Sequence, residues 1–423
     1  MKRPLRFLHL TTFYPPYSFG GDAIYVERLA RALADDGHLV DVVHCVDSFR
    51  LLAKAGSRDV AHEYPGVTVH SLRSPWGPLS PLLSQQTGRP LLKLRALREL
   101  IAATRFDVIH FHNISLFGPD VMKLEPPSGS AVKLYTAHEY WLICPTHVLW
   151  KYNSRACEKP ECLRCTIRAL RPPQWWRYTG LIGRASGHID QFIAPSRFSA
   201  RIHRERGFDA PIEVLPLFAE EPTASHDLRD PPHPHPYFLF AGRVVRLKGI
   251  EALVNAWDRF DQADLLVAGV GTDLEMLRAR AARNSRVRFL GAVSREHLGR
   301  LYSHALACVV PSLAYETFSL AAVEAFASRT PVIARRIGAL EELVEECGGG
   351  ILYDDDDQLR AALERVAADS ALRERLTENG YNAFRERWTR RVHLDRYYEL
   401  IGRVATRKFG PMPGHVPARV ADG

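Results

Sequence analysis

The sequence contains no hydrophobic run of the roughly 18–20 residues that would be needed to cross a bilayer. Its first ten residues also lack the unbroken apolar stretch, about 7–15 residues long, of a secretory signal. We therefore expect a cytoplasmic protein whose first strand covers residues 5–10. The composition, with 46% hydrophobic and 25% charged residues, excludes a mainly disordered chain and a fibrous one.

Two further absences narrow the function. A dehydrogenase with a bound dinucleotide would carry Gly-x-Gly-x-x-Gly after a strand. The nearest match, Gly269-Val-Gly271, has Leu274 at the third glycine position. No nucleic-acid recognition motif accompanies the basic residues, so we expect no nucleic-acid partner.

The surplus of positive charge lies in the first half of the chain. Residues 1–220 hold 28 Lys and Arg against 20 Asp and Glu, whereas residues 221–423 are balanced. Part of the surplus flanks Trp175 and Trp176, and it consists of Arg164, Arg168, Arg171, Arg177 and Arg184. Arginines beside paired tryptophans suit an anionic membrane surface, here the inner face of the membrane. A solvated helix with two aromatic rings in the core is the alternative interpretation.

The order of apolar segments predicts an α/β fold. A strand at 5–10, a Pro/Gly-rich loop, a helix at 24–33 and a strand at 39–45 form a βαβ unit, which implies a parallel sheet. Further strands are predicted at 108–112, 132–135, 192–194, 237–241, 265–268, 287–290, 307–310 and 331–334. Open parallel sheets bind ligands at the carboxyl ends of their strands, so two such domains would face a common cleft.

The proline-rich segment 220–236 has almost no apolar residues and divides the chain. The predicted parts are an N-terminal domain at 1–219 with a cysteine-rich insert at 144–165, a linker or surface loop at 220–236, a second domain at 237–385, a C-terminal helix at 386–407 that returns to the first domain, and a disordered tail at 408–423.

Two motifs in the second domain carry chemistry. In the first, Arg243 and Lys248 follow a predicted strand, and Lys248 is the only lysine between residues 221 and 407. Two cations at a strand end suit a diphosphate, because they neutralise the charge that develops on a leaving group. An ordinary surface loop is the alternative.

The second motif pairs Glu316 with Glu324. A helix that begins near Thr317 would place these carboxylates two turns apart and near one face, where they can hold sugar hydroxyls. The free amides at its start would favour an anion. Two unrelated acidic residues are the alternative.

Taken in order, these segments resemble the retaining nucleotide-sugar glycosyltransferases of the GT-B fold, family 4. The matching features are Gly20-Gly21, His138, Gly242-Arg243 with Lys248-Gly249, Glu316-x7-Glu324 and the segment at 331–334. The resemblance covers roughly residues 5–400. It implies two doubly wound, Rossmann-like domains that face a cleft, the first on the acceptor side and the second binding the nucleotide sugar.

The resemblance also implies roles for residues of the donor diphosphate site. Gly20 and Gly21 would let the backbone approach the diphosphate, because a side chain there would collide with it. Arg243 and Lys248 would bind the diphosphate and stabilise it as it leaves. The reaction would then need no divalent metal.

For the donor sugar, the resemblance implies that Glu316 holds its hydroxyls beside the amides of Ser319 and Leu320. Glu324 would bind the nucleotide ribose, and His138 would lie close to the reacting sugar. The sugar would pass to a glycan or lipid-linked acceptor with retention of configuration. A non-catalytic or degenerate nucleotide-binding scaffold and a nucleotide-sugar epimerase share the fold and are the alternatives.

This sequence departs from the family pattern at four positions. Family members commonly carry glycine where Thr317, Ser319, Arg329 and Ala339 stand. The first two side chains would narrow the space near the donor sugar, so they bear on which sugar is accepted.

Four of the seven cysteines lie within 22 residues: Cys144, Cys157, Cys162 and Cys165. Four thiolates suit a tetrahedral, structural zinc ion. Free thiols are the alternative, and a redox pair is a third interpretation. Disulfides are disfavoured in the cytoplasm.

Overall fold

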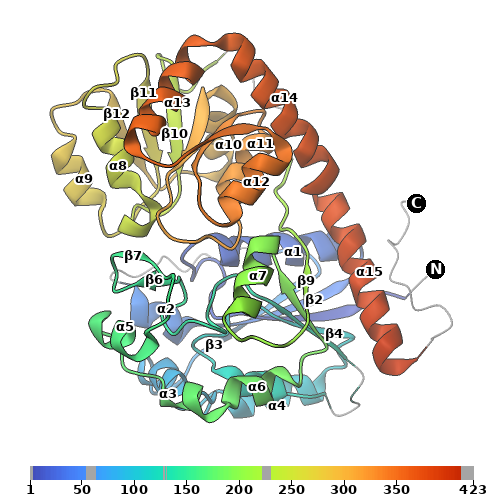
Figure 1. The fold of residues 1–423 in the computed structure, drawn as a ribbon. Coiled ribbons are helices and arrows are strands. Elements are labelled where there is room, and N and C mark those ends of the chain that lie inside the picture. The colour runs from blue at the N-terminus through green and yellow to red at the C-terminus, as the bar shows by residue number, and fades with distance from the viewer. Residues whose placement is uncertain (1–2, 54–62, 127–128, 130, 222–229, 411–423) are drawn as a thin grey trace.

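The structure is a computed structural model of the chain. It describes residues 3–53, 63–126, 129, 131–221 and 230–410. They form two α/β domains, drawn one above the other in Figure 1, and each domain is built on one parallel sheet. The predicted fold class is confirmed.

The first domain contains a seven-stranded sheet in the order β3-β2-β1-β4-β5-β8-β9. Its strands are β1 (Arg6–Leu10), β2 (Leu39–Cys45), β3 (Val67–Leu72), β4 (Val108–Phe111), β5 (Val132–Thr136), β8 (Gln191–Ala194) and β9 (Ile212–Val214). In the central strand, Phe7 pairs with Val40 on one side and with Val108 on the other. The central strands are mostly apolar because helices cover both faces of the sheet.

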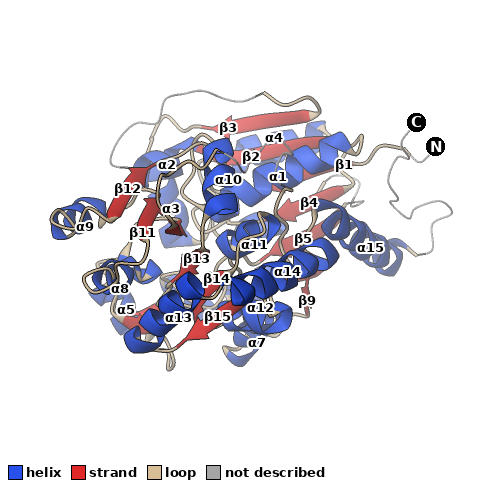
Figure 2. Ribbon diagram, turned by 90° about the horizontal axis from the view of Figure 1, so that it is seen from above, coloured by secondary structure: helices blue, strands red, loops and turns tan. Residues whose placement is uncertain are grey.

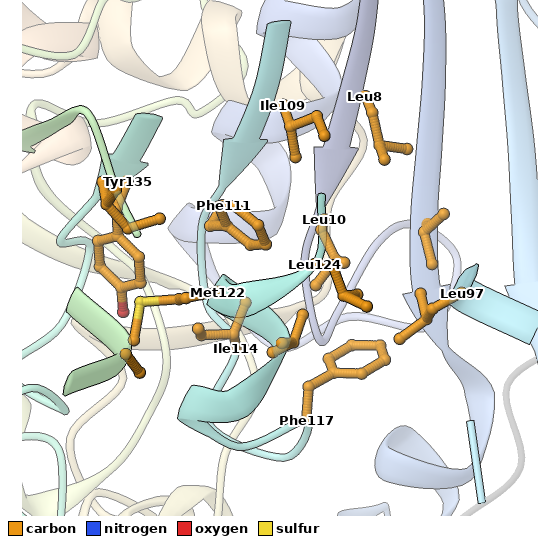
Figure 3. Packing of buried hydrophobic residues seen from close by; sticks show 14 of the residues in the cluster. Leu8, Leu10, Leu97, Ile109, Phe111, Ile114, Phe117, Met122, Leu124 and Tyr135 are labelled. Carbon is orange, nitrogen blue, oxygen red and sulfur yellow. The ribbon is translucent and has the colours of Figure 1, made fainter. Parts of the chain in front are cut away.

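Helices and one small hairpin surround this sheet. They are α1 (Gly21–Asp35), α2 (Val46–Leu52), α3 (Leu79–Thr87), α4 (Leu94–Ala103), η1 (Pro119–Lys123), β6 (Trp150–Lys151), β7 (Arg155–Ala156), α5 (Cys162–Arg168), η2 (Trp175–Thr179), α6 (Leu181–Ser186) and α7 (Arg197–Glu205). On one face of the sheet, Leu10 and Phe111 pack with Phe117 and with Leu97 of α4 (Figure 3). This core holds the carboxyl ends of β1 and β4 in place.

The second domain contains a six-stranded sheet in the order β12-β11-β10-β13-β14-β15. Its strands are β10 (Tyr237–Ala241), β11 (Asp264–Ala268), β12 (Val287–Gly291), β13 (Ala307–Val310), β14 (Val332–Arg335) and β15 (Gly350–Tyr353). Its helices are η3 (Arg246–Lys248), α8 (Ile250–Ala256), α9 (Leu274–Arg280), α10 (Arg295–His304), α11 (Leu320–Ala327), α12 (Ala339–Cys347), α13 (Asp356–Ala368) and α14 (Ser370–Arg387). Within the described residues, none of the helices is long and apolar enough to span a bilayer.

The last helix, α15 (Arg390–Phe409), runs down along the first domain (Figure 1). There Tyr397 Oη lies 2.8 Å from His110 Nδ1. The predicted bounds, 386–407, are wrong: Thr389 caps the helix by accepting a hydrogen bond from the Val392 amide, so the helix starts at residue 390. Lys408 and Phe409 are helical, not part of a tail, and residues 411–423 lie outside the described residues.

The chain passes between the domains at two neighbouring points. The Ala219 amide donates to the Trp388 carbonyl over 3.1 Å, and Ala219 also forms a parallel bridge with Thr389. Two crossings side by side form one hinge. Within the predicted linker, residues 222–229 lie outside the described residues, and His233 is not exposed: it is buried with its Nε2 atom 2.7 Å from the Asp264 carboxylate.

Gly249, at the start of α8, supports the loop that carries Lys248. Its φ of +69° lies in the left-handed region, and a Cβ atom there would come within 1.8 Å of the Pro311 carbonyl oxygen. We expect Gly249→Ala to lower the free energy of unfolding by about 3 kcal/mol or more, because backbone must move. Urea unfolding would measure this.

Gly207 provides the control for backbone strain alone. Its φ is +83°, but a Cβ atom there would meet nothing within 4 Å. Gly207→Ala should therefore lower the free energy of unfolding by only about 1–2 kcal/mol. Equal losses in the two variants would contradict the predicted collision with Pro311.

Candidate functional site

The glycine loop lies where α1 meets the second domain. Gly20 precedes the helix with a φ of +120°, a conformation that favours glycine. A Cβ atom at Gly20 would lie 3.6 Å from Arg243 Nε, and one at Gly21 would lie 3.2 Å from Leu320 Cδ1. The structure thus brings this loop against Arg243, whose guanidinium forms no ion pair with any described residue.

Glu316 is held by two residues of its own domain. Lys248 Nζ donates to Glu316 Oε1 over 2.8 Å, and the Ser312 hydroxyl donates to the same oxygen. The other oxygen, Oε2, has no hydrogen-bond donor among the described residues. Glu316 therefore has one oxygen fixed by a cation and one available to a ligand hydroxyl.

The expected start of the next helix is wrong. Helix α11 begins at Leu320, and Ser319 caps it by accepting from the Ala322 amide. Thr317 stays outside the helix because its hydroxyl donates to the His138 carbonyl over 2.8 Å and its carbonyl accepts from the Ser196 hydroxyl over 2.8 Å. Both partners belong to the first domain, so this segment joins the domains.

Consequently, the two acidic residues do not share a helix face. Glu316 precedes α11, and Glu324 lies within it. Glu324 forms an ion pair of 2.5 Å with Arg28 of α1, and Tyr302 Oη donates to its other oxygen over 3.3 Å. A ribose bound by Glu324 would have to replace one of these partners. Figure 2 shows α1 and α11 next to each other.

Arg28 is a site residue that the sequence interpretation missed. Its Nε and Nη1 atoms are buried and have no hydrogen-bond partner, which leaves donors beside the predicted ribose contact. The signal in the sequence that could have identified Arg28 is its position seven residues after Gly21 on a predicted helix. This spacing places Arg28 two turns along the same face. An ion pair with Glu324 of the other domain could not be read from that spacing.

His138 belongs to a chain of three buried imidazoles. His138 Nε2 lies 3.0 Å from His112 Nδ1, and His112 Nε2 lies 2.8 Å from His9 Nδ1. Burial lowers the pKa of His138 and of His9 to about 3, so both rings are neutral. In neutral rings the two hydrogen bonds run in one direction, so His138 Nδ1 carries a proton only when His9 Nε2 does not.

In the same region, nitrogen atoms of His9, His110 and His112 lie within 4.8 Å of one another, close enough to hold a metal ion. Each ring is already paired: His9 with His112, and His110 with Tyr397 and the Thr136 hydroxyl. The arrangement therefore fits a hydrogen-bond network better than a metal site.

The cysteine-rich insert lies behind the Glu316 segment. Tyr140 Oη donates to the Glu316 carbonyl over 3.1 Å. The Tyr140 ring packs in a cluster with Cys144 and Cys157, and the ring of Tyr315 lies against this cluster. The insert thus contacts the backbone on which Glu316 is placed.

The structure shows why family members carry glycine at the position that Arg329 occupies in this chain. Arg329 has a φ of +58°, in the left-handed region, and its guanidinium lies 3.7 Å from the centre of the Tyr381 ring. Thr317 and Ser319 have local roles instead, the first in joining the domains and the second as a helix cap.

Both halves of the chain match known families. Residues 19–220 match Glycosyltransferase Family 4, and residues 224–383 match Glycosyl transferases group 1. Together with the two-domain fold, these matches show that the chain belongs to the GT-B glycosyltransferases. The predicted enzyme class, a hexosyl- or related glycosyltransferase, is confirmed.

Relatives and solved structures agree with this family. The chain is 29% identical over 375 residues to the D-inositol 3-phosphate glycosyltransferase of Arthrobacter sp. (strain FB24). The aligned region covers 82% of each of the two chains. Sucrose-phosphate synthase from Thermosynechococcus elongatus superposes with a TM-score of 0.73 at 24% identity, over 95% of this chain and all of that one. Anabaena HepE, solved with UDP-glucose, has a TM-score of 0.66 at 17% identity, over 94% of this chain and 99% of that one. The two structures share the fold.

The free energy of unfolding should fall steeply in acid because burial lowers the pKa of many histidines. Those with a pKa of about 4 or lower are His9, His44, His138, His203 and His393, and the pKa values of His110 and His112 are also well below normal. Below pH of about 6.5 the unfolded chain binds these protons and the folded chain does not, so each histidine lowers the free energy of unfolding by about 1.4 kcal/mol per pH unit.

Urea unfolding at pH 7.5, 6.5 and 5.5 tests this expectation, with a fall between the last two. His203→Gln is a matched variant, because His203 Nε2 has no partner and Nδ1 faces only the Ser199 carbonyl of its own helix. It should reduce proton uptake on unfolding by about one. A flat profile below pH of about 6.5 would rule out the buried neutral cluster.

Proposed function

We propose that this protein transfers a sugar from a nucleotide-diphosphate sugar to a glycan or lipid-linked acceptor, with retention of anomeric configuration. The observation that carries the proposal is the convergence of Lys248, Glu316 and Arg243 with the glycine loop, where the two domains meet. Cations, a free carboxylate oxygen and a close backbone approach are what a sugar diphosphate requires.

Each group has one task in this proposal. Arg243 and Lys248 neutralise the diphosphate, and the free amides of Ser319 and Leu320 lie beside it. Glu316 Oε2 accepts a hydrogen bond from a donor sugar hydroxyl. Fixing the sugar in this way lowers the barrier by positioning and by electrostatic stabilisation of the leaving group.

The proposed reaction exchanges one bond at the anomeric carbon. The bond between that carbon and a diphosphate oxygen breaks, and a bond from the acceptor oxygen forms on the same face of the sugar. The acceptor's proton passes to the departing diphosphate. Because Arg243 and Lys248 carry the balancing charge, we propose that no divalent metal is required.

Relatives suggest which donors to test first. HepE, a structure with the same fold, was solved with UDP-glucose. UDP-sugars therefore come first in a binding screen that also includes GDP-, ADP- and dTDP-sugars. Bound donor would raise the unfolding temperature by mass action.

The alternative functions differ in what they require. An epimerase would consume the donor without an acceptor, and a degenerate scaffold would bind the donor without turnover. The paired Lys248 and Glu316 favour a catalytic site, since a scaffold needs no carboxylate oxygen held for a sugar hydroxyl. Acceptor-dependent release of the nucleoside diphosphate distinguishes the three.

The acceptor is proposed to lie at a membrane because of an exposed apolar surface on the first domain. Leu170 is 93% exposed, Trp175 63% and Tyr178 62%. Helix α3 contacts η2, and Leu79 and Leu83 of α3 are exposed as well. Arg164, Arg168, Arg171 and Arg184, which flank these residues in the sequence, are exposed as well. Aromatic and basic groups together suit an anionic lipid surface.

Two residues of the predicted membrane face lie elsewhere. Trp176 is buried, and its Nε1 atom donates to the Gln85 carbonyl over 2.7 Å. The guanidinium of Arg177 lies over the rings of Trp141 and Trp176. The paired tryptophans thus divide, one in the core and one on the surface.

Glu316→Gln and Lys248→Ala should each lower kcat/KM for transfer by about 100-fold to 1,000-fold, the loss typical of one charge-stabilising group. Arg246→Ala is the matched control, because Arg246 lies in the same turn, is exposed and has no side-chain partner among the described residues. The measurement is acceptor-dependent product formation, with the product's anomeric configuration assigned by NMR. Wild-type rates in both site variants would defeat the assignment, and an inverted product would refute retention.

The double variant Trp175→Ser and Tyr178→Ser should bind anionic phospholipid vesicles about 10-fold more weakly, because two exposed aromatic rings are lost. Co-sedimentation would measure the change. Val270→Ser with Met276→Ser is the control, since both are exposed apolar residues of the second domain. Equal vesicle binding by the wild type and both double variants would contradict a lipid-facing surface.

A further inference from the structure

The four cysteines of the insert surround one pocket. Cys144, Cys157, Cys162 and Cys165 all line one small pocket, and none of them forms a disulfide. Three of the four are buried, and Cys162 is half-buried. Residues that are spread over 22 positions of sequence therefore come together around one pocket.

Three separate pieces of backbone bring the sulfurs together. Cys144 lies in a turn closed by its amide, which donates to the Tyr140 carbonyl over 2.7 Å. Cys157 directly follows the β6–β7 hairpin, and Cys162 and Cys165 lie in the first turn of α5. A hairpin followed by a helix whose first turn carries Cys-x2-Cys suits a structural thiolate site.

The backbone of the insert adopts conformations that need an external constraint. Of the described non-glycine residues, six have positive φ, and five of these lie at 147–170: His147, Leu149, Tyr152, Asn153 and Leu170. Such residues persist only where surrounding structure over-determines them. The hairpin has strands of two residues each, so its ladder cannot supply that constraint. A bound group that links the ends of the insert would supply that constraint.

Groups around the pocket suit ionised sulfur. The Tyr152 amide donates to Cys165 Sγ over 3.3 Å. Arg177 forms no ion pair with any described carboxylate, and its Nη2 atom is buried without a partner. Arg177 lies close enough to Cys144 and Cys162 to interact with them electrostatically, so a cation that forms no ion pair faces the cysteine cluster.

One metal ion would bring all four sulfurs into use, because thiolate ligands bind a metal in their deprotonated form.

We propose that Cys144, Cys157, Cys162 and Cys165 together bind one metal centre through four thiolates. The ligand set suits a zinc ion or an iron–sulfur cluster, since both take four cysteines. No three of these sulfurs lie within 4.8 Å of one another. Four thiolates at about 2.3 Å from one zinc ion would be closer together than that, so zinc would draw the sulfurs inward.

The metal centre would influence the proposed donor site through Tyr140. Tyr140 packs against Cys144 and Cys157 and donates to the Glu316 carbonyl. Binding of metal would therefore fix the insert against the segment that carries Glu316. This consequence for turnover rests on the proposed function, whereas metal binding itself does not.

The test measures metal in the full-length protein purified without oxygen. Mass spectrometry of zinc and iron, with an assay for acid-labile sulfide, should find one centre per chain, either zinc alone or iron with sulfide. Cys162→Ser should reduce the bound metal at least 10-fold. Cys347→Ser is the matched control, because Cys347 is half-buried and lies outside the insert. It should retain the metal.

A second measurement uses the wild-type chain, so that the proposal can still be tested if Cys162→Ser fails to fold. Cobalt loaded into metal-depleted protein should give the intense absorption of thiolate-to-cobalt charge transfer, and metal depletion should lower the unfolding temperature by about 5 °C or more. Folded protein without stoichiometric metal and without this absorption would overturn the proposal, as would unchanged metal in Cys162→Ser. A variant that loses metal but still binds vesicles and donor would show that the metal proposal can be judged separately from the proposed function.

Discussion

The structure depends on how the segment from Glu316 to Thr317 is held. The Glu316 carboxylate pairs with Lys248 of its own domain, while its carbonyl accepts a hydrogen bond from Tyr140 of the other domain. Thr317 adds a bond to the His138 carbonyl. A single turn therefore joins the domains and presents a free carboxylate oxygen between them. Because both domains hold Glu316, we expect a movement of one domain against the other to displace the proposed donor site.

A second set of contacts makes α1 part of both domains. Its first residues lie against Arg243 and Leu320, and Arg28 pairs with Glu324. These contacts occupy positions that the family resemblance assigns to a donor. A donor bound there would therefore have to replace some of these protein partners.

The sequence predicted the architecture well because the signal is local. Runs of apolar residues separated by helical patterns specify a parallel sheet with helices on both faces, and the proline-rich segment marks the division. Element ends were less predictable. Helix α11 starts at Leu320 because partners in the first domain hold Thr317 outside it, and α15 starts at Arg390 because Thr389 caps it. Both depend on particular hydrogen bonds.

By itself, then, the sequence determined the fold class and the family, and it predicted the types of side chain at the proposed donor site. Charge and spacing are properties of the chain, so they could mark Arg243, Lys248 and Glu316 as candidates. Only the tertiary structure decided which partner each group takes. It placed Arg28 on Glu324, lined up His138 with His112, and buried Trp176 while leaving Trp175 exposed. Partners far apart in sequence become neighbours only through packing of the two sheets, so no local pattern records them.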